Sequence, residues 1–305
     1  GRRARAADEL IAAGKASLLD VPERLFARSD GTPGEVSQRQ RRQWEAARVN
    51  REWLAPELSA RLRALPYPLY FLDFETCAPA IPRYRGMRPF EVIAYQWACQ
   101  TIAAPDAPPQ HSEWLQSADS FPNSAFVAAL RRQVGDEGAV LVWGSHEGTV
   151  LRAIRGQMAE RGETDSEIYA WLGDFLDSGR LVDMCQLTLK HYCHPRMGGS
   201  TSLKRVADAI WQSDADVRAR LPQYVQETAA GLASPYAALP PLLVGGRAVS
   251  VAEGTAAVLA YYHLMERAAA GATLEAGQWR RLLLQYCRLD TQAMVMVWWH
   301  WRALG

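Results

Sequence analysis

The chain has 305 residues, a formal net charge of +1 and 49% hydrophobic residues. These proportions are those of an ordinary globular protein, so they exclude a disordered chain, a collagen and a disulfide scaffold. The near-neutral charge also argues against a strongly basic nucleic-acid-binding protein.

Charge is spread unevenly along the chain. Residues 1–65 contain 13 Lys or Arg and 9 Asp or Glu, whereas residues 66–305 contain 21 and 24. We therefore expect a basic helical N-terminal segment at 1–65, followed by the main domain. In this segment Ser37 is a predicted N-cap of an arginine-rich helix that contains Trp44 and leads to Trp53. The helix could be solvated and anchored by its tryptophans, or it could lie beside a nucleic-acid track.

Five strands are predicted in the main domain, at residues 68–76, 90–102, 111–115, 139–143 and 180–184. The first is a compact apolar run, which is typical of a buried central strand. Alternation in the second predicts one shared face for Ile93, Tyr95, Trp97 and Cys99. The short links between the first three strands favour antiparallel pairing, and the helices between the later strands predict parallel pairing.

Helical patterns fill much of the remaining chain. They cover residues 122–133, a segment that begins at Glu147, and residues 185–193, 203–211, 253–265 and about 277–301. Residues 212–250 mix Pro, Gly and Ala with little periodicity, so we expect a loop-rich insertion there. The predicted architecture is an α/β fold, in which helices flank a mixed sheet of three antiparallel strands and then two parallel ones.

The sequence contains neither a membrane span nor a disulfide framework. No window approaches the roughly 18 uncharged apolar residues that a span needs, and the opening residues lack the apolar core of a signal peptide. The five scattered cysteines are typical of reduced thiols and predict a cytoplasmic location. The spacing of Cys185, His191, Cys193 and His194 fits no zinc motif. Because the chain begins with Gly1 rather than Met, it could be a fragment of a longer protein.

Two carboxylates at the end of the first strand are the strongest sign of chemistry. Asp73 and Glu75 are two residues apart, so the period of a strand places both on one face. Acidic groups on a buried strand are costly without a counter-charge, and Mg²⁺ prefers carboxylate oxygens. A second pair with the same spacing, Asp165 and Glu167, lies in a polar stretch and is given no role.

Three other regions could join this site. Tyr286 and Asp290 are four residues apart on one face of the last predicted helix, where Asp290 could bind metal or make a structural hydrogen bond. Glu147 could be a site carboxylate or a first-turn acid stabilised by the helix dipole. Asp183 ends the fifth strand and could bind metal or cap the following helix.

These motifs resemble those of the tyrosine-type DEDD 3′–5′ exonucleases, the DnaQ-like branch of the ribonuclease H-like fold. LDFET, with Asp73 and Glu75, is similar to their first motif, and YCRLD, with Tyr286 and Asp290, is similar to their third. In WGSHEGTVL, Glu147 stands where the superfamily usually has Asp, and the preceding Asn is missing. YPLYFLDFET, HPRMGGSTSLK and YCRLDTQAM together are most similar to a bacterial family, defined by a domain of unknown function, within this superfamily.

The resemblance implies a metal-dependent 3′–5′ exonuclease that hydrolyses nucleic acid by a two-metal mechanism, with DNA slightly favoured over RNA. Its catalytic residues would be Asp73, Glu75, Glu147, Tyr286 and Asp290. The four carboxylates, with Asp183 as a further candidate, would hold two Mg²⁺ or Mn²⁺ ions, and the tyrosine would align the attacking water. Substrate contacts are expected from Thr76, His146, Ser200, Ser202 and Lys204. The last three lie near a helix N-terminus that could bind phosphate, or could form an N-cap loop with a surface lysine.

The partner implied by the resemblance is a single-stranded 3′ end, and relatives often carry an upstream nuclease domain. The altered second motif leaves open a catalytically weak or inactive ribonuclease H-like module that binds nucleic acid or a partner protein. An endonuclease for structured junctions is a third, weaker alternative. If the five carboxylates lie around metal ions, the rest of the chain carries +6, so the near-neutral total does not exclude an anionic substrate.

Overall fold

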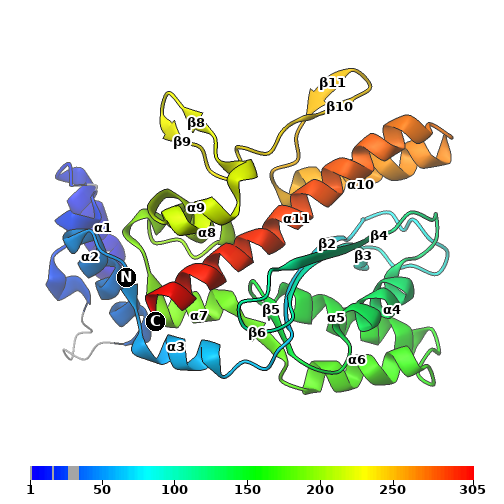
Figure 1. Ribbon diagram of the computed structural model, residues 1–305, viewed down its shortest axis with the longest axis horizontal. Coiled ribbons are helices and arrows are strands. Elements are labelled where there is room, and N and C mark those ends of the chain that lie inside the picture. Colours follow the sequence, from blue (N-terminus) through cyan, green and yellow to red (C-terminus); the bar gives the residue numbers. More distant parts are fainter. Residues whose placement is uncertain (1, 16, 27–33) are drawn as a thin grey trace.

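A five-stranded mixed sheet forms the centre of the computed structural model, which describes residues 2–15, 17–26 and 34–305 (Figure 1). Its strands are β2 (Leu69–Cys77), β3 (Ile93–Ile102), β4 (Gln110–Leu115), β5 (Ala139–Val142) and β6 (Leu181–Asp183). They lie in the order β4-β3-β2-β5-β6. The pairs β2–β3 and β3–β4 are antiparallel, whereas β2–β5 and β5–β6 are parallel. The predicted fold class is confirmed, with small differences at the strand ends.

Helices cover both faces of this sheet. On one face lie α4 (Asn123–Val134), α5 (His146–Glu160) and α6 (Glu167–Asp177). On the other lie α8 (Leu203–Ser213), α10 (Gly254–Ala269) and the longest helix, α11 (Thr273–Leu304). A shorter helix, α7 (Met184–His191), directly follows β6. None of the helices in the described ranges is long and apolar enough to cross a membrane.

Helix α6 forms in a segment for which the sequence pattern predicted no regular structure. Ser166 caps it by accepting a hydrogen bond from the Tyr169 amide at 3.2 Å. Trp171 and Phe175, one turn apart, are buried and stack with their ring centroids 5.1 Å apart. The helix thus has a polar outer face and a short apolar stripe that packs against α4 and α5. The polar residues made this stripe hard to recognise in the sequence.

Alternation along β2 divides the interior into two apolar layers. Leu72 and Phe74 belong to the layer beneath α4, α5 and α6, whereas Phe71 belongs to the layer beneath α11. Successive side chains of a strand point to opposite faces. Asp73 and Glu75 therefore point toward α11, on one face as their spacing predicts.

A β-bulge in β3 changes the faces of that strand. The register between β2 and β3 shifts at Tyr95, which is an extra residue in the ladder. As a result Ile93 and Tyr95 pack in the α11 layer, whereas Trp97 and Cys99 pack in the other layer. The single face predicted for these four residues is wrong, because simple alternation assumes an unbroken register.

Helix α11 runs across the face of the sheet opposite to α4, α5 and α6, and it contacts both β2 and β3 (Figure 1). Trp298 meets Phe71 edge-on, with 5.9 Å between the ring centroids. Closer to the start of the helix, the Gln96 side-chain amide donates a hydrogen bond to the Leu283 carbonyl at 3.0 Å. Apolar packing and a buried hydrogen bond thus hold the helix over the central strands.

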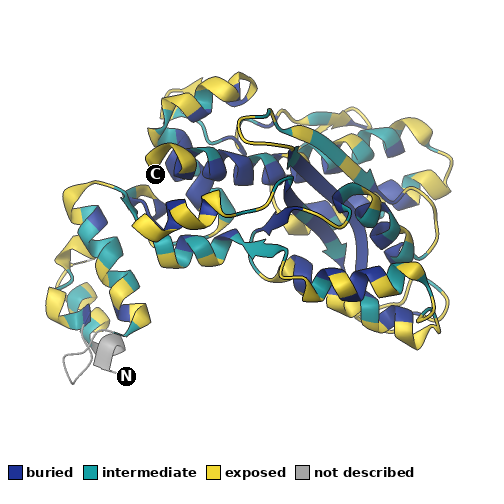
Figure 2. Ribbon diagram, turned by 60° about the horizontal axis from the view of Figure 1, so that its bottom comes forward, coloured by how far each residue is buried: buried dark blue, intermediate teal, exposed yellow. Residues whose placement is uncertain are grey.

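The N-terminal segment stands beside the main body, and its helices are less buried than the sheet (Figure 2). It comprises α1 (Arg2–Ala12), α2 (Glu35–Val49), β1 (Trp53–Leu54) and α3 (Pro56–Arg63). β1 pairs antiparallel with β7 (Tyr192–Cys193), so a short two-stranded sheet ties the segment to the body. The predicted N-cap Ser37 is wrong, because α2 begins three residues earlier than predicted: Gly34 is its N-cap, and Ser37 is buried within the helix.

The tryptophans of this segment make internal contacts. The ring of Trp44 lies 5.8 Å from that of Phe26, and the Arg42 guanidinium lies 4.4 Å over the ring of Trp53. Arg42 also donates a hydrogen bond to the Lys190 carbonyl at 3.1 Å. Both rings therefore help to fix α2 and β1, and a nucleic-acid track along α2 stays a prediction.

A buried ionic network joins this segment to the rest of the molecule. His300 of α11 lies between two carboxylates, with 2.7 Å to Glu52 and 2.7 Å to Asp214. Burial alone would lower the pKa of His300, but hydrogen bonds to both carboxylates raise it above its ordinary value. Tyr192 also donates to Glu52, at 2.9 Å. The network connects the end of the N-terminal segment, β7, α11 and the N-cap of α9 (Ala215–Arg220).

Residues 214–250 contain short elements that lie over α11. These are α9 (Ala215–Arg220) and two hairpins, formed by β8 (Glu227–Thr228) with β9 (Gly231–Leu232) and by β10 (Leu242–Val244) with β11 (Arg247–Val249). Figure 1 shows both hairpins on the side of α11 that faces away from the sheet. Two tyrosines from this stretch reach the helix: Tyr224 donates to Gln292 at 2.5 Å, and Tyr236 donates to Asp290 at 2.6 Å.

We expect Phe71→Ala to lower the free energy of unfolding by about 3–5 kcal/mol. The ring is fully buried at the contact between α11 and the sheet, and its removal leaves a cavity. Urea denaturation followed by tryptophan fluorescence measures the loss. Phe90→Ala is the matched control, because Phe90 is 70% exposed and its removal should change stability by less than about 0.5 kcal/mol. Equal losses for the two variants would contradict this description of the core.

Candidate metal centre

Three potential metal ligands come together where β2 meets α11. Carboxylate oxygens of Asp73 and Glu75 and the sulfur of Cys287 all lie within 4.8 Å of one another. Glu75 and Cys287 are buried, and Asp73 is partly exposed. The alternation of β2 turns both carboxylates toward α11, whose buried face supplies the thiol. These three side chains form a candidate metal-binding group.

Helix α11 adds a tyrosine and a further carboxylate beside this group. Tyr286 and Asp290 are both buried, and the charge of Asp290 contributes to raising the pKa of the Tyr286 phenol. On the other side, the Tyr236 hydroxyl donates a hydrogen bond to Asp290 Oδ1 at 2.6 Å. Burial raises the pKa of both phenols, so they stay protonated and can act as donors.

Glu147 approaches the same place from the first turn of α5. Its side chain is almost fully buried, and Oε2 has no hydrogen-bond partner within the described part of the chain. Burial raises the pKa of Glu147 to about 8, and the charge of Asp183 contributes to the rise. In turn, the charge of Glu147 raises the pKa values of Asp73 and Glu75. A buried carboxylate oxygen without a partner is costly, and a cation would satisfy it.

Burial and crowding make these carboxylates hard to ionise together. Burial raises the pKa values of Asp73 and Glu75 well above their ordinary range, and the charge of Asp290 raises both further. Burial also raises the pKa of Asp290 to about 6, although hydrogen bonds from Tyr236 and Tyr286 act in the opposite direction. At neutral pH the carboxylate cluster, made of Asp73, Glu75, Glu147 and Asp290, therefore retains protons unless a cation offsets its charge.

Lys204, near the start of α8, brings one positive charge to the carboxylate cluster. Its Nζ lies 5.1 Å from the ring centroids of both Tyr236 and Tyr286. The charge of Lys204 lowers the pKa values of Glu75 and Asp290. A single ammonium offsets only part of the charge that four carboxylates would carry, so the site can still accept a divalent cation.

The donor atoms fit a hard divalent cation. Burial and the charge of Asp73 raise the pKa of the Cys287 thiol well above its ordinary value, so the sulfur keeps its proton. It lies 3.6 Å from Asp73 Oδ2 and donates a hydrogen bond to it. The oxygen donors therefore remain for a cation, and carboxylate oxygens are the ligands that Mg²⁺ and Mn²⁺ prefer.

Two predicted substrate contacts, Thr76 and His146, lie close to each other. Thr76 follows Glu75 at the end of β2, and His146 precedes Glu147 at the start of α5. Thr76 Oγ1 and His146 Nε2 are 3.4 Å apart. The two elements thus bring these polar side chains together, and each residue is next in sequence to one of the two glutamates.

The remaining predicted residues make local hydrogen bonds. Asp183 Oδ1 accepts hydrogen bonds from the Gly144 and Gln186 amides, both at 3.0 Å, so it acts as the N-cap of α7. Ser200 and Ser202 lie in the loop before α8, with their hydroxyl oxygens 3.3 Å apart. Lys204 follows these serines in the sequence, and its charge acts on Glu75 and Asp290 of the carboxylate cluster.

Two residues of the site had no predicted role. Cys287 follows Tyr286 directly and lies one turn before Asp290 on α11, so helical spacing carried a signal for it. Tyr236 is 54 residues away from Asp290 in the sequence. It lies in the irregular stretch before α10, where no periodic pattern indicates its contact with α11.

Residues 70–202 match a protein family described as a domain of unknown function, DUF2779. The matched region contains Asp73, Glu75 and Glu147, whereas Tyr286 and Asp290 of α11 lie outside it. Comparison of the sequence with curated proteins and with solved structures gives no match. The geometry of the carboxylate cluster therefore has to carry the functional argument.

We expect the metal-free protein to lose stability as the pH rises from about 5 to 8. The pKa of Glu147 is about 8 in the folded chain, against an ordinary value of 4.5. The folded state therefore binds more protons than the unfolded state between these values, and the free energy of unfolding falls with pH. Glu147→Gln removes this titration and should stabilise the metal-free protein at pH 8 by about 1 kcal/mol or more.

Urea denaturation in EDTA at pH 5 and pH 8 measures this difference. Glu167→Gln is the matched control, because Glu167 is exposed on α6 and should leave the pH dependence unchanged. If Glu147→Gln lost stability with pH as steeply as the wild type, Glu147 would not be the source of the effect.

Proposed function

We propose that this chain is a metal-dependent 3′–5′ exonuclease that hydrolyses the phosphodiester bonds of nucleic acid, with DNA slightly favoured over RNA. The observation that carries the proposal is the buried cluster in which Asp73 and Glu75 of β2 lie beside Asp290 of α11. The resemblance of LDFET and YCRLD to two motifs of the tyrosine-type DEDD exonucleases supports the same reaction. The order of strands in the mixed sheet agrees with the fold of those enzymes.

The four carboxylates would hold two Mg²⁺ or Mn²⁺ ions. When bound, such ions supply electrophilic stabilisation of the negative charge that develops on the phosphate oxygens. The carboxylates would then ionise and release the protons that burial and mutual repulsion now retain on them. The orphaned Oε2 of Glu147 supports its place in the ligand set, although Glu147 enters from a different helix than Asp290.

Tyr286 would orient the attacking water. Its pKa is raised by burial, so the phenol stays protonated at neutral pH and is a poor base. As a protonated phenol near Asp290, it would instead donate a hydrogen bond that positions the water. A water positioned in this way loses less orientational entropy on reaching the transition state.

Lys204, Thr76 and His146 would contact the substrate phosphates. The Lys204 ammonium is partly exposed beside the carboxylate cluster, so it can make a charge-assisted hydrogen bond. Burial lowers the pKa of His146, so its imidazole is neutral at pH 7 and donates one hydrogen bond. The close pair of Thr76 and His146 would therefore offer uncharged donors next to the charged ones.

Asp73→Asn should slow the shortening of a 5′-labelled single-stranded oligonucleotide by roughly a thousandfold, since residues of a metal site act as a unit. It should also weaken Mn²⁺ binding measured by calorimetry. Asp165→Asn is the matched control, because it alters the exposed Asp-x-Glu pair outside the carboxylate cluster. If Asp73→Asn kept the wild-type rate in Mg²⁺ and in Mn²⁺, the proposed function would be wrong.

Tyr286→Phe should lower the rate by about tenfold to a hundredfold, because the water loses its orienting hydroxyl. Mn²⁺ binding should remain, since no ligand oxygen is removed. Tyr169→Phe on α6 tests whether loss of any phenol has the same effect. A Tyr286→Phe protein that loses Mn²⁺ binding along with activity would show that the hydroxyl holds Asp290 rather than water.

A weak or inactive ribonuclease H-like module that binds nucleic acid or a partner protein is the second candidate. Two observations favour it: Glu147 stands where the superfamily usually has Asp, and the Tyr236 hydroxyl occupies one oxygen of Asp290. Such a module would bind no Mn²⁺ in calorimetry and would leave the oligonucleotide intact. The wild-type protein alone therefore separates the two candidates.

A further inference from the structure

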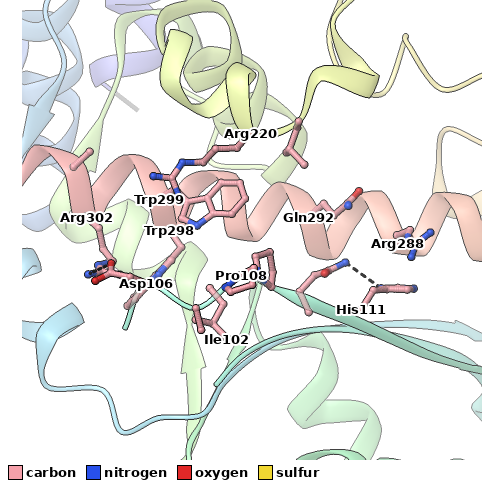
Figure 3. Close-up of a pocket in the computed structure, with 15 residues that line it drawn as sticks. Ile102, Asp106, Pro108, His111, Arg220, Arg288, Gln292, Trp298, Trp299 and Arg302 are labelled. Carbon is pink, nitrogen blue, oxygen red and sulfur yellow. Dashed lines mark hydrogen bonds and ion pairs between the residues drawn. The ribbon is translucent and has the colours of Figure 1, made fainter. Parts of the chain in front are cut away.

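A basic groove lies along α11 (Figure 3). It has a volume of about 820 Å³ and is bordered by α11, α9, the edge strand β4 and the loop that follows β3. Arg288 and Gln292 line the groove, and Asp290 between them belongs to the carboxylate cluster. Residues two apart on a helix point in nearly opposite directions. One helix thus presents acidic groups to one side and basic groups to the other.

The groove is elongated along α11. Arg288 and His111 lie at one end, and Arg302 with Asp106 lies at the other (Figure 3). With a rise of 1.5 Å per residue, the distance along the helix axis from Arg288 to Arg302 is about 21 Å. A single phosphate or a small anion would occupy only one end, whereas a chain with charges at intervals could contact both.

Two of its three arginines are free to bind a ligand. Within the part of the chain that the structure describes, neither Arg220 nor Arg288 has a carboxylate oxygen within 4.0 Å. Arg302 is paired with Asp106 at 3.3 Å. Near Arg288, the carboxylate of Glu113 is bound to His111 at 2.8 Å. The guanidinium donors of Arg220 and Arg288 therefore remain available for an anionic ligand.

The other lining groups match the parts of a nucleotide. The Arg220 guanidinium lies 4.9 Å over the ring of Trp299, which is partly exposed in the groove. The amides of Gln100 and Gln292 also line it, but both already make hydrogen bonds within the protein, to His111 and Thr291 and to Tyr224. Arginines that bind phosphates, together with aromatic rings that stack on unpaired bases, are typical of proteins that hold single strands.

We propose that this groove binds single-stranded nucleic acid, with Arg220 and Arg288 on its phosphates and Trp299 beside a base. The inference rests on the proposed function for the class of ligand, but it requires no hydrolysis. It places a second contact with the strand apart from the carboxylate cluster. It also gives a role to the Arg of YCRLD, which faces away from the Tyr and Asp of the same motif.

The test is the affinity for a fluorescein-labelled single-stranded oligonucleotide, measured by anisotropy in EDTA so that nothing is cleaved. Arg220→Ala/Arg288→Ala should weaken binding about tenfold or more. The slope of log affinity against log salt should fall by about 1.4, since each lost phosphate contact contributes about 0.7 for a single strand. Arg132→Ala/Arg247→Ala removes the same charge from exposed positions outside the groove and should leave affinity and slope unchanged.

Equal affinities of the two double variants would overturn the inference. Displacement of the oligonucleotide by polyglutamate at the same charge concentration would also overturn it, in favour of an acidic peptide as the ligand. Hydrolysis of bis(p-nitrophenyl) phosphate, which can reach the carboxylate cluster without the groove, should be the same in the Arg220→Ala/Arg288→Ala protein as in the wild type. If the wild type bound the oligonucleotide through the groove but hydrolysed no phosphodiester, the groove would stand and the exonuclease proposal would fall.

Discussion

The packing of α11 across β2 and β3 is the contact on which both the core and the candidate site depend. Phe71 and Trp298 meet at this contact, and the Gln96 amide fixes the helix to the sheet. The same contact brings Asp290 of α11 to the carboxylates of β2. Because a helix has several faces, α11 can bury apolar residues, complete an acidic site and line a basic groove along its length. A change in its position would alter all three.

Electrostatic repulsion within the carboxylate cluster opposes this packing. Burial and proximity raise the pKa values of its carboxyl groups, so the fold holds them together at a cost in stability. Lys204 and the hydroxyls of Tyr236 and Tyr286 offset part of that cost. Clustered carboxyl groups whose pKa values are strongly raised are more typical of a functional site than of a structural one. The net charge of the whole chain is near neutral, so it gives no sign that an acidic site and a basic groove lie apart in the fold.

Local periodicity was enough to predict the architecture of the sheet. The strand positions and their antiparallel and parallel order follow from apolar runs and the lengths of the links between them. It failed where a residue interrupts the period, as Tyr95 does in β3. The prediction also failed at the start of α2. Serine is a residue type typical of an N-cap, but Gly34 rather than Ser37 is the N-cap of this helix. In both places a competing backbone arrangement decided the result, and side-chain type alone does not reveal it.

The sequence by itself determined that Asp73 and Glu75 share one face of β2, because a strand has a period of two. It likewise placed Tyr286 and Asp290 on one face of a helix, through a spacing of four. Only the tertiary structure decided that these two faces meet, and that Tyr236 reaches Asp290 across 54 residues of chain. Spacing within one element fixes directions relative to that element's own axis. The distance between two elements depends on how their apolar faces pack, which no local pattern contains.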